Sequence, residues 1–226
     1  MTNVNQNKKI IGICGLIGSG KDTAADYLVQ EFGFRRDSFA ATLKDAISKI
    51  FGWDRDLLEG RTKESREWRE LPDLWWANRL GMPNLTPRWV LQYWGTEVCR
   101  YGFHEDIWIA STEYRLHSSK DNIVISDCRF PNEIQSIRQS GGKVVWIQRG
   151  QLPEWYELAV QANTTPPNSE MHLRLIDKGV HISETAWIGT KFDVTVTNDG
   201  TIDELYANTE SLIISEIRNE VALSPA

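Results

Sequence analysis

The hydrophobic residues of this chain fall into short apolar runs and longer amphipathic stretches. Residues 9–14 form an apolar run that leads into glycines, which is typical of a buried strand in a parallel sheet. In residues 21–32 the apolar positions recur at helical spacing, and Gly33 follows where a helix cap is expected. The pattern therefore predicts a strand, a glycine turn and a helix in succession.

The rest of the chain repeats this alternation. Strands are predicted at residues 38–40, 122–127 and 143–149, and a last strand with a turn after it is predicted within residues 192–200. Helices are predicted at residues 43–51, 63–69, 107–116, 131–142 and 201–221. A further helix has Thr86 as its N-cap and Pro87 as its first residue, and its apolar stripe continues to Tyr101. Alternating strands and helices predict an α/β fold with a central parallel sheet that helices cover on both faces.

Length and composition narrow the class of protein. The 226 residues predict one domain over residues 1–226, with a Trp-rich helical insertion at about 53–118 and a lid or loop region at about 150–191. The net charge of −6 argues against a nucleic acid polymer as partner and favours a small anion held by a few local cations. The cysteines lack zinc-site spacing, and no apolar run approaches the ~20 residues that span a membrane. We therefore expect a cytoplasmic protein without a membrane partner.

The strongest chemical signal is the segment "GLIGSGKDT", which matches the G-x-x-x-x-G-K pattern of a phosphate-binding loop. Glycines let backbone N–H groups approach phosphate oxygens, the helix N-terminus adds partial positive charge, and Lys21 can reach the β- and γ-phosphates. The alternative is a glycine turn with a chance lysine, but the predicted strand and helix provide the context that the motif requires. The predicted nucleotide-binding residues are Gly15, Gly18, Ser19, Gly20, Lys21, Asp22 and Thr23.

The metal ligands are less well defined by the sequence. Asp22 occupies the position after the lysine, where Ser or Thr normally binds Mg²⁺, so either Asp22 or the following Thr23 can serve the ion. Asp127 ends a predicted strand at the sheet edge where ligands gather, and it is predicted to orient the metal, although it can instead cap the next turn. Arg129 can bind phosphate as a planar fork.

The helix that begins at Thr86 carries a polar stripe, with Arg88, Gln92, Thr96 and Arg100 at successive i+4 steps. Arginine suits a phosphate and glutamine suits the edge of a base, whereas the alternative is a solvated helix face. A glycine inside this helix, Gly95, favours the functional interpretation because it costs ~1 kcal/mol and often permits close approach. The ten tryptophans suggest either extra core in the insertion or indoles that stack on a base.

Several segments together resemble the deoxynucleoside monophosphate kinases of bacteriophages. These segments are "SGKDT", "FAATLKDAI", "TPRWVLQYWGTEVCR", "ISDCRFPNEI", "HISE" and "TNDGTIDEL", and they occur in the family's order over nearly the whole chain. The resemblance implies a P-loop fold like that of nucleoside monophosphate kinases, a three-layer αβα arrangement with a helical acceptor-binding insertion. It also implies ATP and Mg²⁺ as co-substrate and cofactor, small-molecule nucleotides as partners, and the host cytoplasm as location. The oligomeric state is left open, and a homodimer is compatible with the sequence.

The resemblance also implies roles for individual residues. Residues Lys44, Arg88, Gln92 and Arg100 are expected to face the acceptor. Three more residues on matched segments are grouped with the substrate-binding set, namely Glu133, His181 and Glu184. The acceptor implied is a deoxynucleotide such as dGMP or dTMP.

In the mechanism that follows, the catalytic residues are Lys21, Asp127 and Arg129. Lys21 neutralises charge on the transferred phosphoryl group, Asp127 positions the metal, and Arg129 clamps phosphate, as Arg88 and Arg100 also do. The acceptor monophosphate already carries an anionic oxygen, so alignment and electrostatics suffice without a strong general base. Two alternatives stay open at this point: a P-loop kinase for dephospho-coenzyme A or a metabolite alcohol, and a switch protein that binds ATP without transferring phosphate.

Overall fold

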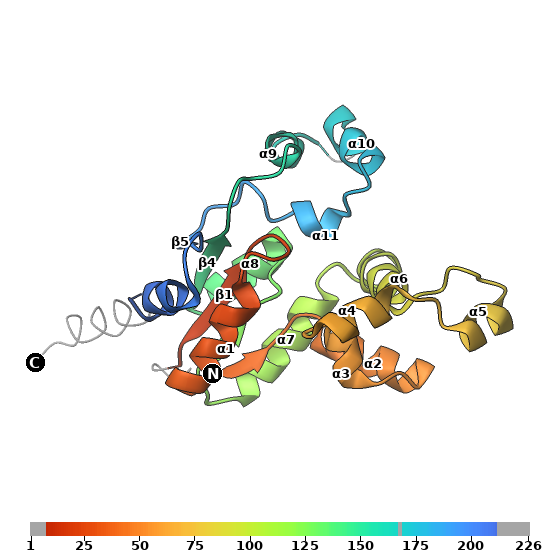
Figure 1. Cartoon of the computed structure of the whole chain (residues 1–226), viewed down its shortest axis with the longest axis horizontal. Coiled ribbons are helices and arrows are strands. Elements are labelled where there is room, and N and C mark those ends of the chain that lie inside the picture. Colours follow the sequence, from red (N-terminus) through yellow and green to blue (C-terminus); the bar gives the residue numbers. More distant parts are fainter. Residues whose placement is uncertain (1–7, 167–168, 212–226) are drawn as a thin grey trace, which may run out of the picture. The chain divides into compact units, whose positions relative to one another are not determined.

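The computed structural model describes residues 8–166 and 169–211. The chain divides into two units, one formed by the residues up to Asp37 together with those from Lys120 onward, and the other by residues Ser38–Ser119 (Figure 1). In the described ranges, no helix combines the length and the apolar character that crossing a bilayer requires. The division into one domain with an insertion at about 53–118 and a lid at about 150–191 stays a prediction.

The first unit contains a five-stranded sheet whose strands are all parallel (Figure 1). In chain order the strands are β1 (Ile10–Cys14), β2 (Arg35–Asp37), β3 (Ile123–Ile125), β4 (Lys143–Gln148) and β5 (Val194–Thr197). Their order across the sheet is β2-β3-β1-β4-β5, so β1 is central. Four of the five predicted strands are thereby confirmed.

The strand predicted at residues 38–40 is wrong, because the second strand is β2, a few residues earlier. This strand is made of Arg35, Arg36 and Asp37, and so it lacks the apolar or alternating pattern on which strand prediction depends. It forms because its backbone pairs with β3, with Arg35 opposite Ile123. Tertiary pairing here overrides the low strand propensity of charged residues.

Helices cover both faces of the sheet, as the sequence predicts. Ile11 and Ile13 of β1 pack in one cluster with residues of α1 (Lys21–Phe32). Gly12 points to the opposite face, where a Cβ would clash with Ile137 of α8 (Pro131–Gln139). Since successive strand residues face opposite sides, α1 and α8 lie on opposite faces, and the three-layer αβα arrangement is confirmed.

The remaining helices of the first unit follow β4. The segment 150–191, which has no clear sequence pattern, contains α9 (Tyr156–Asn163), α10 (Glu170–Asp177) and α11 (Ile182–Thr185). Residues 202–211 are helical after β5, and Leu205 joins the cluster around α1. The rest of the helix predicted at 201–221 lies outside the described residues.

The second unit is entirely helical. Its elements are α2 (Ala41–Phe51), α3 (Arg55–Glu59), α4 (Lys63–Glu70), α5 (Leu74–Leu80), α6 (Pro87–Tyr93), the π-helix η1 (Trp94–Tyr101) and α7 (Ile107–Ser118). The helices predicted at 43–51, 63–69 and 107–116 are therefore confirmed. So is the predicted start of α6, because the Thr86 side chain accepts a hydrogen bond from the backbone N–H of Trp89 at 3.1 Å.

The long helix after Thr86 changes its winding at Trp94, where α6 gives way to η1. A π-helix has i→i+5 hydrogen bonds, so Thr96 and Arg100 do not continue the i+4 stripe predicted from Arg88 and Gln92. Both Thr96 and Arg100 are buried. A Cβ on Gly95 would lie 2.9 Å from Leu43, so the close approach that this glycine permits comes from a core side chain of the same unit.

Aromatic side chains form much of the core of the second unit. The ring of Phe51 stacks on Trp53 at 4.4 Å and meets the edge of Trp76 at 4.9 Å. The indole N–H groups have internal acceptors: Trp53 donates to Asp73 at 2.7 Å and Trp76 to the carbonyl of Phe51 at 2.9 Å. These indoles therefore serve packing, while stacking of a base on any tryptophan stays a prediction.

Candidate nucleotide-binding site

The phosphate loop connects the central strand β1 to α1. Gly18 and Gly20 have φ angles of 79° and 95°, a left-handed conformation that glycine adopts without strain. The backbone N–H of Ser19 donates to the carbonyl of Leu16 at 3.1 Å, which tightens the loop. The Ser19 side chain is buried, and in the part of the chain that the structure describes its hydroxyl has no hydrogen-bond partner.

The amino terminus of α1 is open to an anion. Within the described chain, no side chain caps this end of the helix, whose N-cap residue is Gly20. The first N–H groups of a helix have no partner inside the helix, and the helix dipole concentrates positive charge there. The loop and this helix end therefore form the backbone arrangement that binds phosphate.

Lys21 lies at the centre of a group of charged residues. Its ammonium donates to the carbonyl of Leu16 at 3.3 Å. Burial and the nearby positive charge of Arg129 lower the pKa of Lys21. Three carboxylates oppose that shift by electrostatic attraction, and they belong to Asp22, Glu184 and Asp127. The structure thus brings together five of the residues that the sequence singles out, although they come from separate segments of the first unit.

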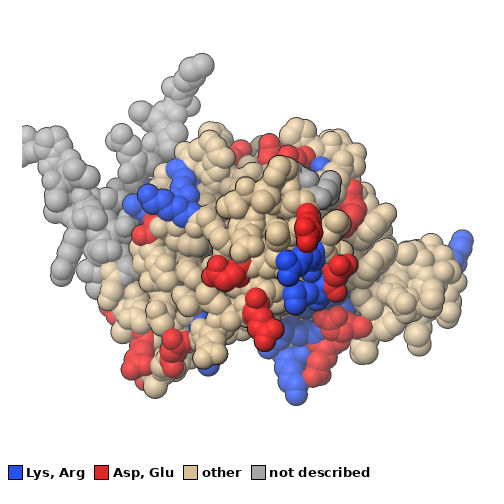
Figure 2. Space-filling view, turned by 90° about the horizontal axis from the view of Figure 1, so that it is seen from above, with Lys and Arg blue, Asp and Glu red and all other residues tan. Residues whose placement is uncertain are grey.

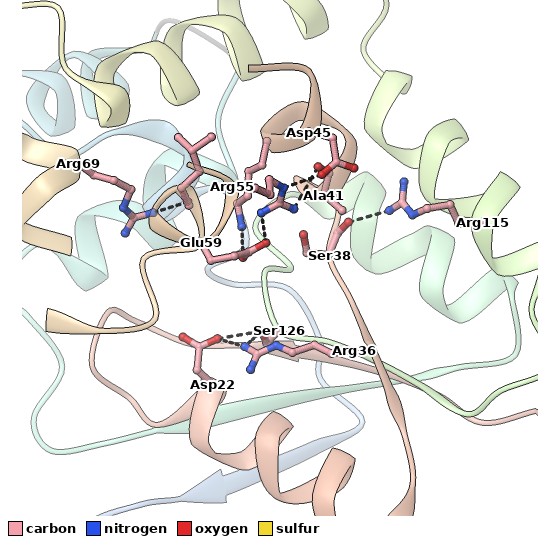
Figure 3. A network of polar contacts seen from close by, with 12 residues as sticks. Asp22, Arg36, Ser38, Ala41, Asp45, Arg55, Glu59, Arg69, Arg115 and Ser126 are labelled. Carbon is pink, nitrogen blue, oxygen red and sulfur yellow. Dashed lines mark hydrogen bonds and ion pairs between the residues drawn. The ribbon is translucent and has the colours of Figure 1, made fainter. Parts of the chain in front are cut away.

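The carboxylate of Asp22 is held by Arg36 and Ser126 (Figure 3). Both bonds go to the same oxygen, Oδ1, and the Ser126 hydroxyl lies 2.9 Å from it. Arg36 also pairs with Asp26, one turn farther along α1, and donates to Ser126 at 2.7 Å. Burial alone would raise the pKa of Asp22, but the cations of Lys21 and Arg36 outweigh it and lower that pKa, so the carboxylate is ionised at neutral pH.

This arrangement fits a magnesium site that is shared with a nucleotide. Among the described residues, no three His, Cys, Asp or Glu side chains converge as a protein-only metal site would require. Magnesium bound with a nucleotide needs only one or two protein carboxylates, because the phosphates and water supply the other ligands. The Asp22 side chain is 61% exposed, which leaves its second oxygen accessible. The choice between Asp22 and Thr23, and the role of Asp127, stay predictions.

Arg129 is fixed from two sides. Its guanidinium pairs with Glu184 at 2.5 Å and donates to the carbonyl of Ser183 at 3.4 Å. Burial alone would lower the pKa of Arg129, but the Glu184 carboxylate raises it, so the cation is retained. The backbone N–H of Arg129 donates at 2.8 Å to Glu133, a buried residue of α8 that also accepts from Phe130 at 3.1 Å. Glu133 therefore orients the segment that carries Arg129, and its contact with substrate stays a prediction.

His181 precedes α11 and caps it. Its Nδ1 atom accepts a hydrogen bond from the backbone N–H of Ser183 at 3.2 Å and lies 2.8 Å from the Ser183 hydroxyl. This cap positions Glu184 on the first turn of α11, and Glu184 in turn holds Arg129. The weak "HISE" signal thus marks a local structure that supports the Arg129 guanidinium.

The residues expected to face the acceptor lie in the second unit and have partners there. Lys44 pairs with Glu59 at 2.7 Å, and Glu59 also pairs with Arg55, which in turn binds Asp45 at 2.6 Å (Figure 3). Burial alone would raise the pKa of Glu59, but the cations of Lys44 and Arg55 lower it to about 2.

The other three acceptor candidates have different surroundings. Arg88 pairs with Glu70 of α4. Gln92 is half-buried on α6. Arg100 is buried and donates to the carbonyl of Glu105 at 3.3 Å. Substrate contacts of these side chains stay predictions.

Two residues around the loop carry no sequence signal that would assign them to the site. Arg36 lacks such a signal because its strand, β2, has no apolar pattern. Asn198 follows β5, and its side chain donates to the carbonyl of Ser19 at 2.8 Å. Asn198 lies in the "TNDG" segment, which supports the family resemblance but does not predict this contact with Ser19.

On the face shown in Figure 2, positive and negative side chains are interspersed among the described residues.

The parallel sheet with β1 at its centre and the phosphate loop between β1 and α1 define a P-loop fold. No family model matches the chain. A protein named as a deoxynucleotide monophosphate kinase of Acanthamoeba polyphaga mimivirus is 31% identical over 216 residues, covering 90% of this chain and 95% of that protein. A deoxynucleoside-5'-monophosphate kinase of Escherichia phage T5 is 27% identical over 180 residues, covering 58% of this chain and 72% of that protein. The chain belongs to the deoxynucleotide monophosphate kinase family, and the resemblance found in the sequence is confirmed.

Two solved structures of kinases are similar to this chain at low sequence identity. A shikimate kinase of Aquifex aeolicus has 12% identity and a TM-score of 0.44, covering 94% of this chain and 98% of its own. A gluconokinase of Sinorhizobium meliloti has 16% identity and a TM-score of 0.44, and the match covers 96% of this chain and 98% of that chain. The fold is defined by the sheet order and the phosphate loop rather than by these likenesses.

Proposed function

We propose that this protein transfers the γ-phosphoryl group of ATP to a deoxynucleoside monophosphate and forms the diphosphate, with Mg²⁺ as cofactor. The observation that carries the proposal is the phosphate loop with its uncapped helix, in a chain that belongs to the deoxynucleotide monophosphate kinase family. The cluster of charges around Lys21 supports it further. The reaction takes place on free nucleotides in the cytoplasm of the host.

Positioning and electrostatics account for catalysis in this proposal. The backbone N–H groups of the loop and the Lys21 ammonium neutralise the charge that develops on the transferred phosphoryl group. Arg129, held in place by Glu184, contacts the same phosphates as a planar fork. An acceptor monophosphate already carries an anionic oxygen, so the reaction needs no strong general base.

Asp22, Thr23 or Asp127 would hold a magnesium ion together with the phosphates of ATP. The ion would supply positive charge at the phosphate oxygens. Arg36 and Ser126 hold one oxygen of Asp22, which leaves the other oxygen for the ion.

The acceptor is bound by four residues named from the resemblance, which are Lys44, Arg88, Gln92 and Arg100. The resemblance also groups Glu133, His181 and Glu184 with the substrate-binding set, and Glu133 and Glu184 serve the substrates by holding Arg129. Part of the segment 150–191 closes over the reacting phosphates and excludes water, because water would otherwise hydrolyse ATP.

An assay of ADP release tests the proposal. ATP and Mg²⁺ are offered with each of the four deoxynucleoside monophosphates and with the matched ribonucleotides. Lys21→Ala is the inactive comparison, and Lys63→Ala is the matched control because Lys63 is 80% exposed on α4. ADP that appears only with particular deoxynucleotides, in wild type and Lys63→Ala but not in Lys21→Ala, supports the proposal and names the acceptor.

Two other results would contradict the proposal. If the protein binds ATP but no monophosphate stimulates ADP release, the proposal is wrong. ADP release that requires a metabolite alcohol instead would identify another kind of small-molecule kinase.

A further inference from the structure

Asn198 joins the last strand of the sheet to the phosphate loop. It follows β5 directly, and only 7% of its surface is exposed. Its backbone N–H donates to the carbonyl of Gln148, the last residue of β4, at 2.8 Å. Its side-chain Nδ2 donates to the carbonyl of Ser19 at 2.8 Å. The backbone bond holds Asn198 at the edge of the sheet, and the side-chain bond holds the phosphate loop to Asn198.

The contact also determines the orientation of one peptide group. The Ser19–Gly20 peptide is trans, because the described chain contains no cis peptide bond. In a planar trans peptide the C=O and the N–H point in opposite directions. Since the carbonyl of Ser19 points to Asn198, the N–H of Gly20 points away from Asn198. A single side chain therefore sets the direction of one of the loop's N–H donors.

Gly20 is adapted to the same contact. Its φ angle is 95°, and a Cβ placed on it would clash with the Nδ2 of Asn198 and lie 3.4 Å from Leu205. Both the conformation and the space thus require glycine. The final glycine of the G-x-x-x-x-G-K pattern lets Asn198 approach the loop.

We propose that Asn198 is a positioning residue for the triphosphate of the nucleotide, an inference that rests on the proposed function of the loop. By holding the Ser19 carbonyl, it presents the N–H of Gly20 to a phosphate oxygen before the nucleotide binds. Asn198 does not itself contact the reacting atoms. An asparagine is suited to this role because its amide donates a hydrogen bond without adding charge beside an anion site.

Two substitutions test the proposal. Asn198→Ala removes the donor, and Asn198→Asp keeps the shape but places a carboxylate against the Ser19 carbonyl. Asn208→Asp is the matched control, because Asn208 is exposed in the helix 202–211 and its side chain donates to the Thr197 carbonyl over a long 3.4 Å. Affinity is measured by calorimetry with a non-hydrolysable ATP analogue and, separately, with inorganic tripolyphosphate. Thermal unfolding without ligand measures stability.

We expect Asn198→Ala to weaken both ligands by about ten-fold, the effect of one hydrogen bond of ordinary net strength. Asn198→Asp should weaken both ligands more than Asn198→Ala does, because it adds a negative charge near the triphosphate. Asn208→Asp should bind both like the wild type. If Asn198→Ala does not fold, Asn198→Asp carries the test because it occupies the same volume.

Two results would overturn the inference. If the folded variants bind both ligands with wild-type affinity, Asn198 has a structural role and does not position the triphosphate. A loss for the ATP analogue without a loss for tripolyphosphate would mean that Asn198 acts on the base or the sugar. Both readouts are independent of the acceptor, so a failure of deoxynucleotide phosphorylation is recognised separately, in the ADP-release assay.

Discussion

The guanidinium of Arg36 holds the carboxylate of Asp22, the residue that follows the phosphate-loop lysine. Arg36 reaches it from β2, and Ser126, just beyond β3, donates to the same oxygen. A strand residue thereby fixes a side chain at the amino end of α1. The first turn of α1 is thus tied to the carboxyl edge of the sheet, where the predicted ligands gather.

Replacing Arg36 should impair the use of ATP. In Arg36→Met, Asp22 loses its guanidinium partner, and the pKa of Asp22 rises because Arg36 is among the causes that lower it. We expect kcat/KM for ATP to fall by about ten-fold or more, since a displaced group at a phosphoryl-transfer site is costly. Steady-state kinetics with varied ATP and Mg²⁺ measure the effect.

The neighbouring arginine provides the control for this substitution. Arg35 is 39% exposed and pairs with Asp37 at 3.2 Å and Asp121 at 3.4 Å. Arg35→Met should keep kcat/KM within about two-fold of the wild type, because the ion pairs of Arg35 are with Asp37 and Asp121 rather than with Asp22. Equal losses in the two variants would contradict the role assigned to Arg36.

The ATP affinity of the protein should depend on pH through Lys21. The charged amine exists below its pKa, and burial together with Arg129 already lowers that pKa from 10.5. Glu184 opposes the shift, so Glu184→Gln should lower the pKa of Lys21 further. The alkaline loss of affinity for an ATP analogue should therefore begin at a lower pH in Glu184→Gln than in the wild type.

Titration of affinity against pH, from neutral to alkaline, measures this shift. Glu154→Gln is the control, because Glu154 is exposed in the segment before α9. An unchanged alkaline limb in Glu184→Gln would show that the carboxylate does not influence the lysine.

The ionised carboxylate of Glu59 should stabilise the folded protein at neutral pH. Its pKa is lowered from 4.5 to about 2, which corresponds to about 3 kcal/mol of stabilisation at neutral pH. This contribution is complete above pH 4.5 and is lost as the pH falls toward about 2. Glu59→Gln should reduce the free energy of unfolding in urea at pH 7, and its difference from the wild type should shrink at lower pH.

Asp45→Asn is the matched comparison for Glu59→Gln. Asp45 shares the partner Arg55, but its side chain is 65% exposed against 20% for Glu59. Its loss should cost less than about 1 kcal/mol, as exposed pairs do. A larger loss from Asp45→Asn than from Glu59→Gln would refute the assignment of Glu59 as the central group.

The two left-handed glycines of the loop should differ in their tolerance of alanine. Gly18→Ala meets no atom within 4 Å, so its cost is that of the left-handed backbone, about 1–2 kcal/mol. Gly20→Ala has the same backbone cost, and its Cβ also clashes with Asn198. Thermal unfolding should therefore show a larger loss for Gly20→Ala. Equal losses would mean that the loop relaxes away from Asn198.

The local parts of the fold and site follow from the sequence. The apolar run of β1, the glycines and the amphipathic α1 are neighbours along the chain, and their patterns reflect local backbone geometry and burial. For the same reason Thr86 and Pro87 predict the start of α6. The amino-acid sequence by itself therefore determines the position of the phosphate loop and of Lys21 within it.

The tertiary structure decided which distant residues meet that loop. Ser126 lies 104 positions from Asp22 and Asn198 lies 179 positions from Ser19, and no local pattern records such pairings. They follow from the strand order, which places β3 and β4 beside β1 and β5 beside β4. The strand that carries Arg36 exists only because its backbone pairs with β3. Local propensity thus determined β1, the glycine loop and α1, whereas pairing across the sheet determined β2 and the surroundings of the site.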